Sequence, residues 1–360
     1  MMNMKHVILY KDPGAYSCFP AITQDGEGRL WVSFRRAGGF SLKAVQQGKY
    51  DHVDKGARIA LVHSDDGGET WSDARILPPF DPERGEQDPS IKVLEDGVMM
   101  INFFQWFVVP EEEKNRLKYP ARQQHDGSWA DVEGPLIIRS SDGGETWEED
   151  PVMVDSDPLA RAGTSDAVIE LPGGELMMGI YGADYGDNVC RAYSVISRDG
   201  GDSWGEPALI AADPEGRISF EEPGLTLTAD GKILAAIRAG EPGDYQYLYQ
   251  AVSEDGGKSW IDLHQTPMWG HPASVLRLSD GRLVCSYGHR REPYGIRACV
   301  SLDEGRTWDI ENEIVLRDDG ESRDLGYPCT IQLRDGRLLT VYYIHGQDGI
   351  RHIAGTFWSL

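Results

Sequence analysis

Short apolar runs alternate along the chain with glycine-containing turns at a nearly regular spacing. In six places an apolar run reaches Asp-Gly or Gly-Gly and a second apolar run follows, which is the pattern of a β-hairpin. These turns lie at residues 26–30, 96–99, 173–176, 230–233, 280–283 and 335–338. Five of the first strands open with a proline, namely Pro20, Pro89, Pro223, Pro272 and Pro328, and the third opens at Ser165 and Asp166. The pattern therefore predicts six hairpins of similar construction.

A second motif, Ser-x-Asp-x-Gly-x-x-Trp, is interleaved with these hairpins. Its five copies begin at Ser64, Ser140, Ser197, Ser253 and Ser301. The aspartate can accept hydrogen bonds from amides of its own turn, the glycine supplies a positive φ, and the tryptophan can fold back over the apolar side of the hairpin. We interpret the copies as structural turns whose acids are not catalytic.

Together the two repeats define a unit of four strands and roughly 50 residues. Six such units predict one all-β domain over residues 1–360, a six-bladed β-propeller with four antiparallel strands in each blade. The sixth unit lacks the second motif, so we expect the strand from His6 to Tyr10 to supply its outer strand and close the ring. Both kinds of turn then lie on one face, and the variable residues gather on the other face around the axis.

Composition narrows the classes of partner. The chain has 35 Lys and Arg against 59 Asp and Glu, a net charge of −24, and it contains no basic run. This balance argues against nucleic acid and against an acidic membrane surface. The longest uncharged apolar run, residues 97–110, is too short to span a bilayer.

The cysteines indicate a compartment. The chain has five, an odd number, widely spaced and without a Cys-x-x-Cys pair. We expect free thiols in a reducing compartment and, with no signal segment visible, a cytoplasmic location. No histidine or cysteine cluster suggests a metal, and we expect neither a metal nor another cofactor.

Polar and aromatic residues concentrate where the inner strands start and where their partners end. The starts carry Asp88, Asp166, Glu221, Glu222, His271 and Tyr327, and the ends carry Arg35, Arg36, Trp106, Arg238 and Arg291. Arginines and aromatics from several blades at one axis favour a ligand pocket over a merely solvated channel. Two long loops, residues 36–56 and 105–134, rise from the same face and can form a wall or partial lid. Within the second, residues 110–118 form either a short helical turn or a charged loop.

The Ser-x-Asp-x-Gly-x-x-Trp copies match the motif called the Asp box. Asp boxes on six blades, with arginines near the axis, resemble the sialidase (neuraminidase) superfamily over essentially the whole chain. Asp boxes also occur in propellers with other functions, so they indicate the architecture more specifically than the activity.

The resemblance implies roles for individual residues. Tyr327, in the context of residues 325–329, matches the tyrosine nucleophile, and Glu222, with Glu221 as the alternative, matches the glutamate that activates it. Arg238 and Arg291 match arginines that bind the substrate carboxylate. Asp54 matches the acid/base aspartate of the first long loop, and Asp51 is the alternative.

One position departs from the family pattern. The first-blade motif of arginine, an apolar residue and proline reads Cys18-Phe19-Pro20 here, so one carboxylate-binding arginine is missing, and Arg35 or Arg36 could replace it. The resemblance therefore implies an exo-acting retaining hydrolase of a terminal acidic sugar, such as sialic acid or a related 2-keto-3-deoxy sugar. The alternatives are a glycosidase or lyase for a uronic or neutral sugar, and a propeller that binds carbohydrate without catalysis.

Overall fold

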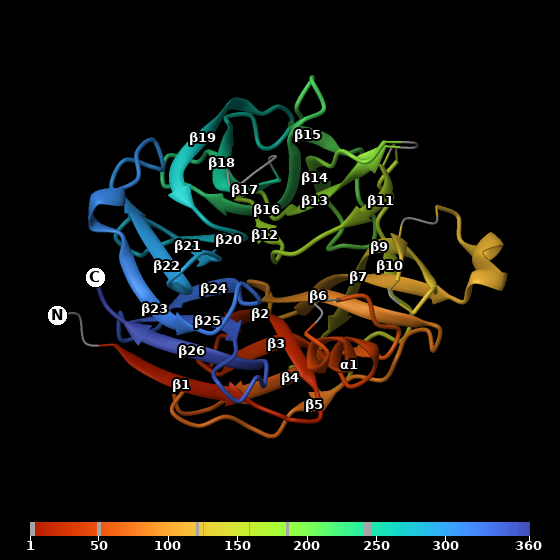
Figure 1. Ribbon diagram of the computed structural model, residues 1–360. Helices are drawn as coiled ribbons and strands as arrows, with labels where there is room; N and C mark the ends of the chain where they lie inside the picture. Colours follow the sequence, from red (N-terminus) through yellow and green to blue (C-terminus); the bar gives the residue numbers. More distant parts are fainter. Residues whose placement is uncertain are drawn as a thin grey trace.

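The computed structural model describes residues 4–48, 52–119, 122–124, 126–157, 159–184, 187–240 and 246–360. They form six antiparallel sheets arranged as the blades of a propeller around one axis (Figure 1). Each blade has four strands from the axis outward, and blades 2 and 3 each carry one additional short strand. The predicted six-bladed fold is confirmed.

The blades follow one another along the chain. Blade 1 contains β2 (Tyr16–Gln24), β3 (Leu30–Ala37), β4 (Ala57–Ser64) and β5 (Arg75–Ile76). Blade 2 contains β6 (Arg84–Val93), β7 (Met99–Val109), β9 (Trp129–Ser140) and β10 (Val152–Met153), with β8 (Arg122–Gln123) beside β9. Blade 3 contains β11 (Leu159–Gly163), β13 (Leu176–Asp184), β14 (Arg191–Ser197) and β15 (Ala208–Ala211), with β12 (Ile169–Glu170) also beside β13.

The second half of the ring is more regular. Blade 4 contains β16 (Ser219–Leu227), β17 (Ile233–Gly240), β18 (Tyr247–Ser253) and β19 (Ile261–Trp269). Blade 5 contains β20 (Ala273–Arg277), β21 (Leu283–His289), β22 (Tyr294–Ser301) and β23 (Ile314–Gly320). Blade 6 contains β24 (Gly326–Gln332), β25 (Leu338–Ile344), β26 (His352–Trp358) and, from the other end of the chain, β1 (Lys5–Tyr10).

The first strand closes the ring. β1 pairs antiparallel with β26, with Val7 opposite Gly355, and Figure 1 shows the red β1 lying along the blue β26. The closing strand predicted from His6 is thus confirmed and begins one residue earlier. Joining the two ends of the chain in one sheet holds the first and last blades together.

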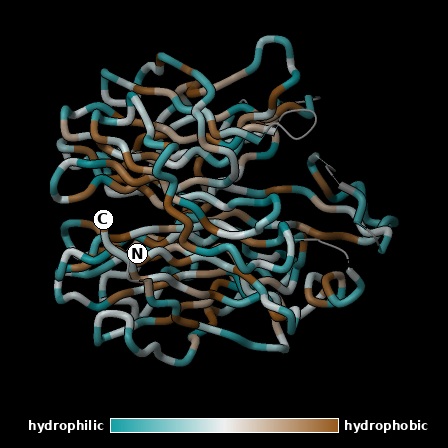
Figure 2. Tube along the Cα trace, turned by 60° about the vertical axis from the view of Figure 1, so that its left-hand side comes forward, coloured by the Kyte–Doolittle hydropathy of each residue, from teal (hydrophilic) through white to brown (hydrophobic). Residues whose placement is uncertain are grey.

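The apolar core is divided among the six junctions between neighbouring blades. At the junction of blades 6 and 1, Phe34 and Val62 pack with Val341 and Phe357. Five further clusters fill the junctions from blades 1 and 2 round to blades 5 and 6. In Figure 2 hydrophobic segments run through the interior of the molecule, and many of the outer turns are hydrophilic. Because each blade is packed on both sides, the ring is a rigid frame for the residues at its axis.

The Asp-box turns have the structural role predicted for them. In the first turn the Ser64 hydroxyl donates to Asp66 Oδ1 (2.8 Å), and the Thr70 amide and hydroxyl donate to the same carboxylate (2.9 and 2.5 Å). The hydrogen bonds from Thr70 and Ser64 lower the pKa of Asp66 to about 2. Trp71 packs against the core between blades 6 and 1. The Gly68 amide donates to the Ser64 hydroxyl (2.8 Å). The bond from serine to aspartate and the bond from glycine to serine recur in the other four copies.

The inner strand of blade 3 differs from its predicted start at Ser165 and Asp166. It begins at Leu159 and is interrupted between β11 and β12. At the interruption the Asp166 carboxylate accepts from the Ala167 amide (3.0 Å), and the Asn102 side chain donates to the Asp166 carbonyl (2.9 Å). These side-chain bonds replace strand pairing at this point, so Asp166 lies at a break in the strand.

The described residues include three short helices outside the sheets. α1 (Phe40–Gln46) lies in the long loop of blade 1, where no helix was predicted. The 3₁₀ helix η1 (Glu111–Arg116) is the first of the two alternatives for the loop of blade 2, and η2 (Ile310–Asn312) precedes β23. No helix in the described ranges is long and apolar enough to cross a bilayer.

Candidate active site

The inner strands of four blades share a distortion directly before a proline. Phe19, Asp88, Glu222 and Tyr327 have φ values of 56°, 49°, 50° and 50°, and the pairing register of each strand shifts at this point. Residues other than glycine rarely adopt positive φ, and such strain concentrates at functional sites. A bulge redirects the side chain of the extra residue. These four side chains are therefore candidates for the site.

Tyr327 and Glu222 meet across the axis from blades 6 and 4. The Tyr327 hydroxyl donates to Glu222 Oε1 at 2.5 Å. Arg238, near the end of β17, donates from Nη1 to both oxygens of the same carboxylate (3.1 and 3.0 Å), while its Nε lies 3.5 Å from Glu221 Oε2. Glu222 is 4% exposed, and Tyr327 is half-buried. Three of the expected site residues are thus one hydrogen-bonded group, and Glu222 rather than Glu221 contacts the tyrosine.

The surroundings keep the phenol of Tyr327 protonated. Burial raises the pKa of Tyr327 well above its usual value, the carboxylates of Glu222 and Asp88 raise it further, and Arg238 and Arg290 oppose them. The tyrosine is therefore neutral at neutral pH, with its proton directed at Glu222.

Of two adjacent arginines after β21, Arg290 is the one beside Tyr327. Its guanidinium carbon lies 5.7 Å from the Tyr327 ring centre, and its Nε donates to the Leu325 carbonyl at 3.0 Å. Its Nη2 is buried and has no hydrogen-bond partner among the described residues. Arg291, the residue expected from the sequence, instead lies 4.3 Å from the Trp269 ring centre and donates to His289 (3.3 Å). An unpaired buried N–H is costly, so Arg290 is the arginine available for a ligand.

Arg35 is buried beside Cys18, which stands where the family pattern has an arginine. Arg35 and Cys18 face each other on β3 and β2, with Arg35 Nη1 3.6 Å from the Cys18 sulfur. Arg35 Nη2 donates to the Ser41 hydroxyl (3.0 Å) and to the His52 carbonyl (2.5 Å). Both Cys18 and Arg35 are fully buried, and burial raises the pKa of Cys18. Arg35 thus brings a cation close to position 18, but loop groups occupy one end of its guanidinium.

The side chain that blade 1 presents to the tyrosine is aromatic. The Phe19 ring centre lies 4.4 Å from that of Tyr327. Arg36 points elsewhere, because its guanidinium binds Asp12 (2.5 Å) and the Tyr10 hydroxyl (2.8 Å). The structure therefore does not bring Arg36 together with Tyr327 and Glu222.

Asp54 is buried in the long loop of blade 1. Its Oδ2 accepts from the Ser41 amide and its Oδ1 from the Gly56 amide, both at 2.8 Å. It lines a cavity of about 470 Å³ between the loops of blades 1 and 2, together with Val108 and Pro110. The carboxylate thus fixes the loop around α1. The alternative, Asp51, lies outside the described residues.

Asp88 is electrostatically coupled to Tyr327 and Glu222. It is 2% exposed and accepts from the Gln87 side chain at 2.7 Å. Burial raises the pKa of Asp88 well above its usual value, and the neighbouring Glu222 raises it further. Asp88 in turn raises the pKa of Tyr327, which places it within electrostatic reach of both residues.

The remaining predicted residues surround this group at greater distance. Asp166 lines a small axial cavity with Tyr327, and burial raises its pKa to about 7. His271 is 3% exposed, and its Nε2 bonds to Gln246 at 2.8 Å. Trp106 lines a separate pocket between blades 2 and 3. Within the described part of the chain no group of three or more His, Cys, Asp or Glu is placed to hold a metal.

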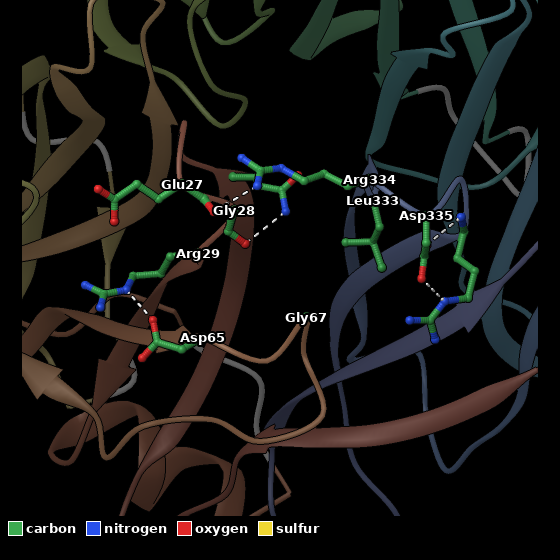
Figure 3. Close-up of a pocket in the computed structure, with 10 residues that line it drawn as sticks. Glu27, Gly28, Arg29, Asp65, Gly67, Leu333, Arg334 and Asp335 are labelled. Carbon is green, nitrogen blue, oxygen red and sulfur yellow. Dashed lines mark hydrogen bonds and ion pairs between the residues drawn. The ribbon is translucent and has the colours of Figure 1, made fainter.

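Another pocket lies on the turn face, between blades 1 and 6, and Figure 3 shows it. Its arginines are held by neighbouring groups: Arg29 binds Asp65 at 2.6 Å, and Arg334 donates to the Glu27 carbonyl at 2.9 Å. None of the predicted site residues lines it. The axis, not this pocket, is the candidate active site.

Fold and axis together define a propeller of the Asp-box class with a tyrosine, glutamate and arginine group at its centre. The profile of the BNR repeat-like domain matches residues 107–340, and that of the BNR/Asp-box repeat matches residues 62–73. The chain therefore belongs to the BNR repeat-like family. No curated protein matches the sequence.

Solved structures show the same fold. A Dyadobacter fermentans protein of unknown function is 30% identical over 99% of both chains, with a TM-score of 0.88. The Hadza microbial sialidase Hz136 is 18% identical over 96% of this chain and 66% of its own, with a TM-score of 0.70. The α-L-arabinanase of Penicillium chrysogenum, in complex with arabinobiose, is 14% identical over 99% and 98%, with a TM-score of 0.68. At the identities of the last two, the likeness concerns the fold.

Proposed function

We propose that the protein is an exo-acting retaining glycoside hydrolase that removes a terminal acidic sugar, such as sialic acid or a related 2-keto-3-deoxy sugar. The observation that carries the proposal is the 2.5 Å hydrogen bond from Tyr327 to Glu222, held by Arg238 at the bottom of an axial site. A sugar of this class carries a carboxylate on its anomeric carbon. An anionic nucleophile would approach it against like charge, and a neutral tyrosine avoids that repulsion.

Each group then has a definite step. Glu222 takes the phenol proton as the Tyr327 oxygen forms a bond to the anomeric carbon, and the bond from that carbon to the leaving oxygen breaks. Water later attacks the same carbon, and the proton on Glu222 returns to the tyrosine oxygen as it leaves. Two displacements at one carbon retain its configuration. Arg238 and the unpaired N–H of Arg290 are suited to bind the sugar carboxylate.

The leaving oxygen requires a proton donor, for which the resemblance implies Asp54. We favour Asp88, because burial holds its carboxyl in the protonated form and it is electrostatically coupled to Tyr327. Asp54 accepts a backbone amide at each oxygen, so its contribution is to position the loop. In this scheme Asp88 gives its proton to the departing oxygen and later takes one from the attacking water.

A second candidate is a glycosidase or lyase for a uronic or neutral sugar. It is favoured by the environment of blade 1, where Phe19 contacts Tyr327 and Arg35, opposite Cys18, is completely buried. With fewer accessible arginines, the site would bind a substrate carboxylate less strongly, so a substrate without a carboxylate on its anomeric carbon would fit. A propeller that binds carbohydrate without turnover is the third outcome.

One experiment separates these functions. A fluorogenic sialoside and a panel of uronate and neutral aryl glycosides are incubated with the wild type and with Tyr327→Phe. Hydrolysis of the sialoside that disappears in the variant supports the proposal. Turnover of another glycoside alone supports the second candidate, and binding with no product from any substrate would leave the third.

A further inference from the structure

A pocket of about 310 Å³ lies between blades 2 and 3. Phe104, Trp106 and Tyr181 contribute aromatic walls, and Gly163 and Gly182 also line the pocket. An alanine at Gly182 would put its Cβ 2.3 Å from the Arg161 carbonyl. The backbone therefore approaches closely here, and glycine is required to keep the strands of blade 3 together.

The pocket adjoins the candidate active site. Burial raises the pKa of Tyr181, and the carboxylates of Glu222 and Asp88 raise it further. Burial raises the pKa of Cys190, on the same pocket wall, to about 12, with Glu221 contributing next. A sugar bound at Tyr327 and Glu222 can therefore extend a substituent, or a neighbouring residue of a glycan, toward blades 2 and 3.

Arg161 gives this pocket an uncompensated positive charge. It is half-buried and donates to the Asp187 carbonyl at 3.1 Å. Within the described ranges no carboxylate lies within 4 Å of its guanidinium, although the chain has a net charge of −24. The nearby acids are committed elsewhere: Asp184 and Asp187 both pair with Arg191 at 3.0 Å.

Two further groups bear on this charge. Burial raises the pKa of Asp131 and the charge of Arg161 lowers it, but the Asp131 carboxylate accepts its hydrogen bonds from the backbone amides of Tyr119 (2.7 Å) and Val132 (2.9 Å). The indole N–H of Trp106 is buried without a hydrogen-bond partner among the described residues. A half-buried cation that no carboxylate of the described residues contacts directly, in an aromatic-walled pocket, is stabilised when an anion binds there.

We propose that this pocket binds an anionic substituent of a carbohydrate, a carboxylate or a sulfate ester, through Arg161, with the sugar ring against the aromatic walls. The inference rests on the proposed function only in taking the substrate to be a carbohydrate. It adds a second point of charge recognition, distinct from the arginines beside Tyr327. The substrate would then carry an acidic group away from the bond that is cleaved.

Binding is measured on the Tyr327→Phe protein, so that no turnover is needed. The probes are methyl β-D-glucuronide, methyl β-D-glucoside 6-sulfate and the neutral methyl β-D-glucoside, titrated calorimetrically at low and physiological salt. At least one anionic probe should bind about tenfold or more tightly than the neutral one. The tighter of the two anionic probes identifies the acidic group, and that preference should weaken with salt.

Three further variants locate the interaction. Arg161→Gln should remove the preference for the anionic probe and leave the neutral probe unchanged. Asn188→Asp changes an exposed residue at the pocket rim and supplies a carboxylate that competes for Arg161. It should weaken binding of the anionic probe. Arg277→Gln is the matched control, because Arg277 also donates to one backbone carbonyl (3.0 Å) and lies on the opposite face; it should bind like the parent.

The proposal fails if neither anionic probe binds more tightly than the neutral one. It also fails if Arg161→Gln, folded by its melting temperature, keeps the preference. Should Arg161→Gln not fold, unchanged binding in Asn188→Asp would overturn the proposal instead. Absence of glycoside hydrolysis by the wild type, with the anion preference intact, would contradict the proposed function alone.

Discussion

The Tyr327 hydroxyl lies 2.5 Å from Glu222 Oε1, although the two residues are 105 positions apart in the chain. Each stands directly before a proline, at a bulge with a φ of 50°. The same distortion at the start of two inner strands therefore directs both side chains toward one point on the axis. The contact between Tyr327 and Glu222 is held by the inner strands of the ring, so it forms without movement of a loop.

Replacing Tyr327 with phenylalanine tests the role of this contact. The substitution removes the oxygen that would attack but keeps the ring that packs 4.4 Å from Phe19. We expect turnover to fall by about a thousandfold or more, while the melting temperature changes by only a few degrees. Hydrolysis of the fluorogenic sialoside or another cleaved glycoside, measured beside thermal melts, gives both values. Activity within tenfold of the wild type would exclude a tyrosine nucleophile.

The fold was predictable because its signals are local. The hydrogen bonds that define an Asp-box turn, such as those of Asp66, fall within four residues, so the motif carries its own structure. The prolines after Glu222 and Tyr327 likewise mark the bulges of two inner strands, which made these two residues identifiable although β16 begins at Ser219, before its proline. Nothing comparable marks the long loop of blade 1, and neither α1 nor the two backbone bonds of Asp54 follows from a periodic pattern.

The choice between neighbouring arginines shows where sequence reasoning ends. Arg290 and Arg291 follow β21, and no repeat fixes the direction of a side chain beyond the end of a strand. The contacts decide, since Arg290 lies over Tyr327 and Arg291 over Trp269. Phe19 carries the same sequence signal as Glu222 and Tyr327, because it too directly precedes a proline.

A pair of substitutions separates the two arginines. Arg290→Gln removes the unpaired buried N–H beside Tyr327 and should lower kcat/KM for an acidic glycoside by about 10- to 100-fold. Arg291→Gln should change it by less than about threefold, because its guanidinium contacts Trp269 and His289. Steady-state kinetics on both variants provides the comparison. The reverse order would restore the assignment of Arg291 that the resemblance implies.

The identity of the proton donor can be tested with leaving groups of different basicity. Asp88→Asn should slow release of a basic leaving group, such as the lactose of sialyllactose, by about a hundredfold or more. A good leaving group, such as 4-methylumbelliferone, needs little protonation, so the rate of its release should fall by less than about tenfold. Asp54→Asn should lower both rates to a similar extent through the loop that Asp54 fixes. If the leaving-group dependence appears in Asp54→Asn instead, Asp54 is the donor.

The buried carboxyl of Asp166 should make stability depend on pH. Burial raises its pKa to about 7, whereas an unfolded chain would titrate near 3.8. The folded state thus favours the neutral carboxyl, so its stabilising contribution is complete below pH 3.8 and is lost as the pH rises through 7. Asparagine keeps an oxygen for the Ala167 amide and never ionises.

Asp166→Asn should therefore match the wild type near pH 4 and become more stable by about 1–3 kcal/mol at pH 8. Thermal or urea unfolding of both proteins from pH 4 to 8 measures the difference. Glu86 and Asp131, whose pKa values burial raises to about 7 and about 6, titrate in both proteins and cancel from it. A constant difference across this range would show that the Asp166 carboxyl does not titrate as its burial implies. Because Asp166 lines the same axial cavity as Tyr327, activity measured alongside would show whether the strained axis tolerates a permanently neutral group there.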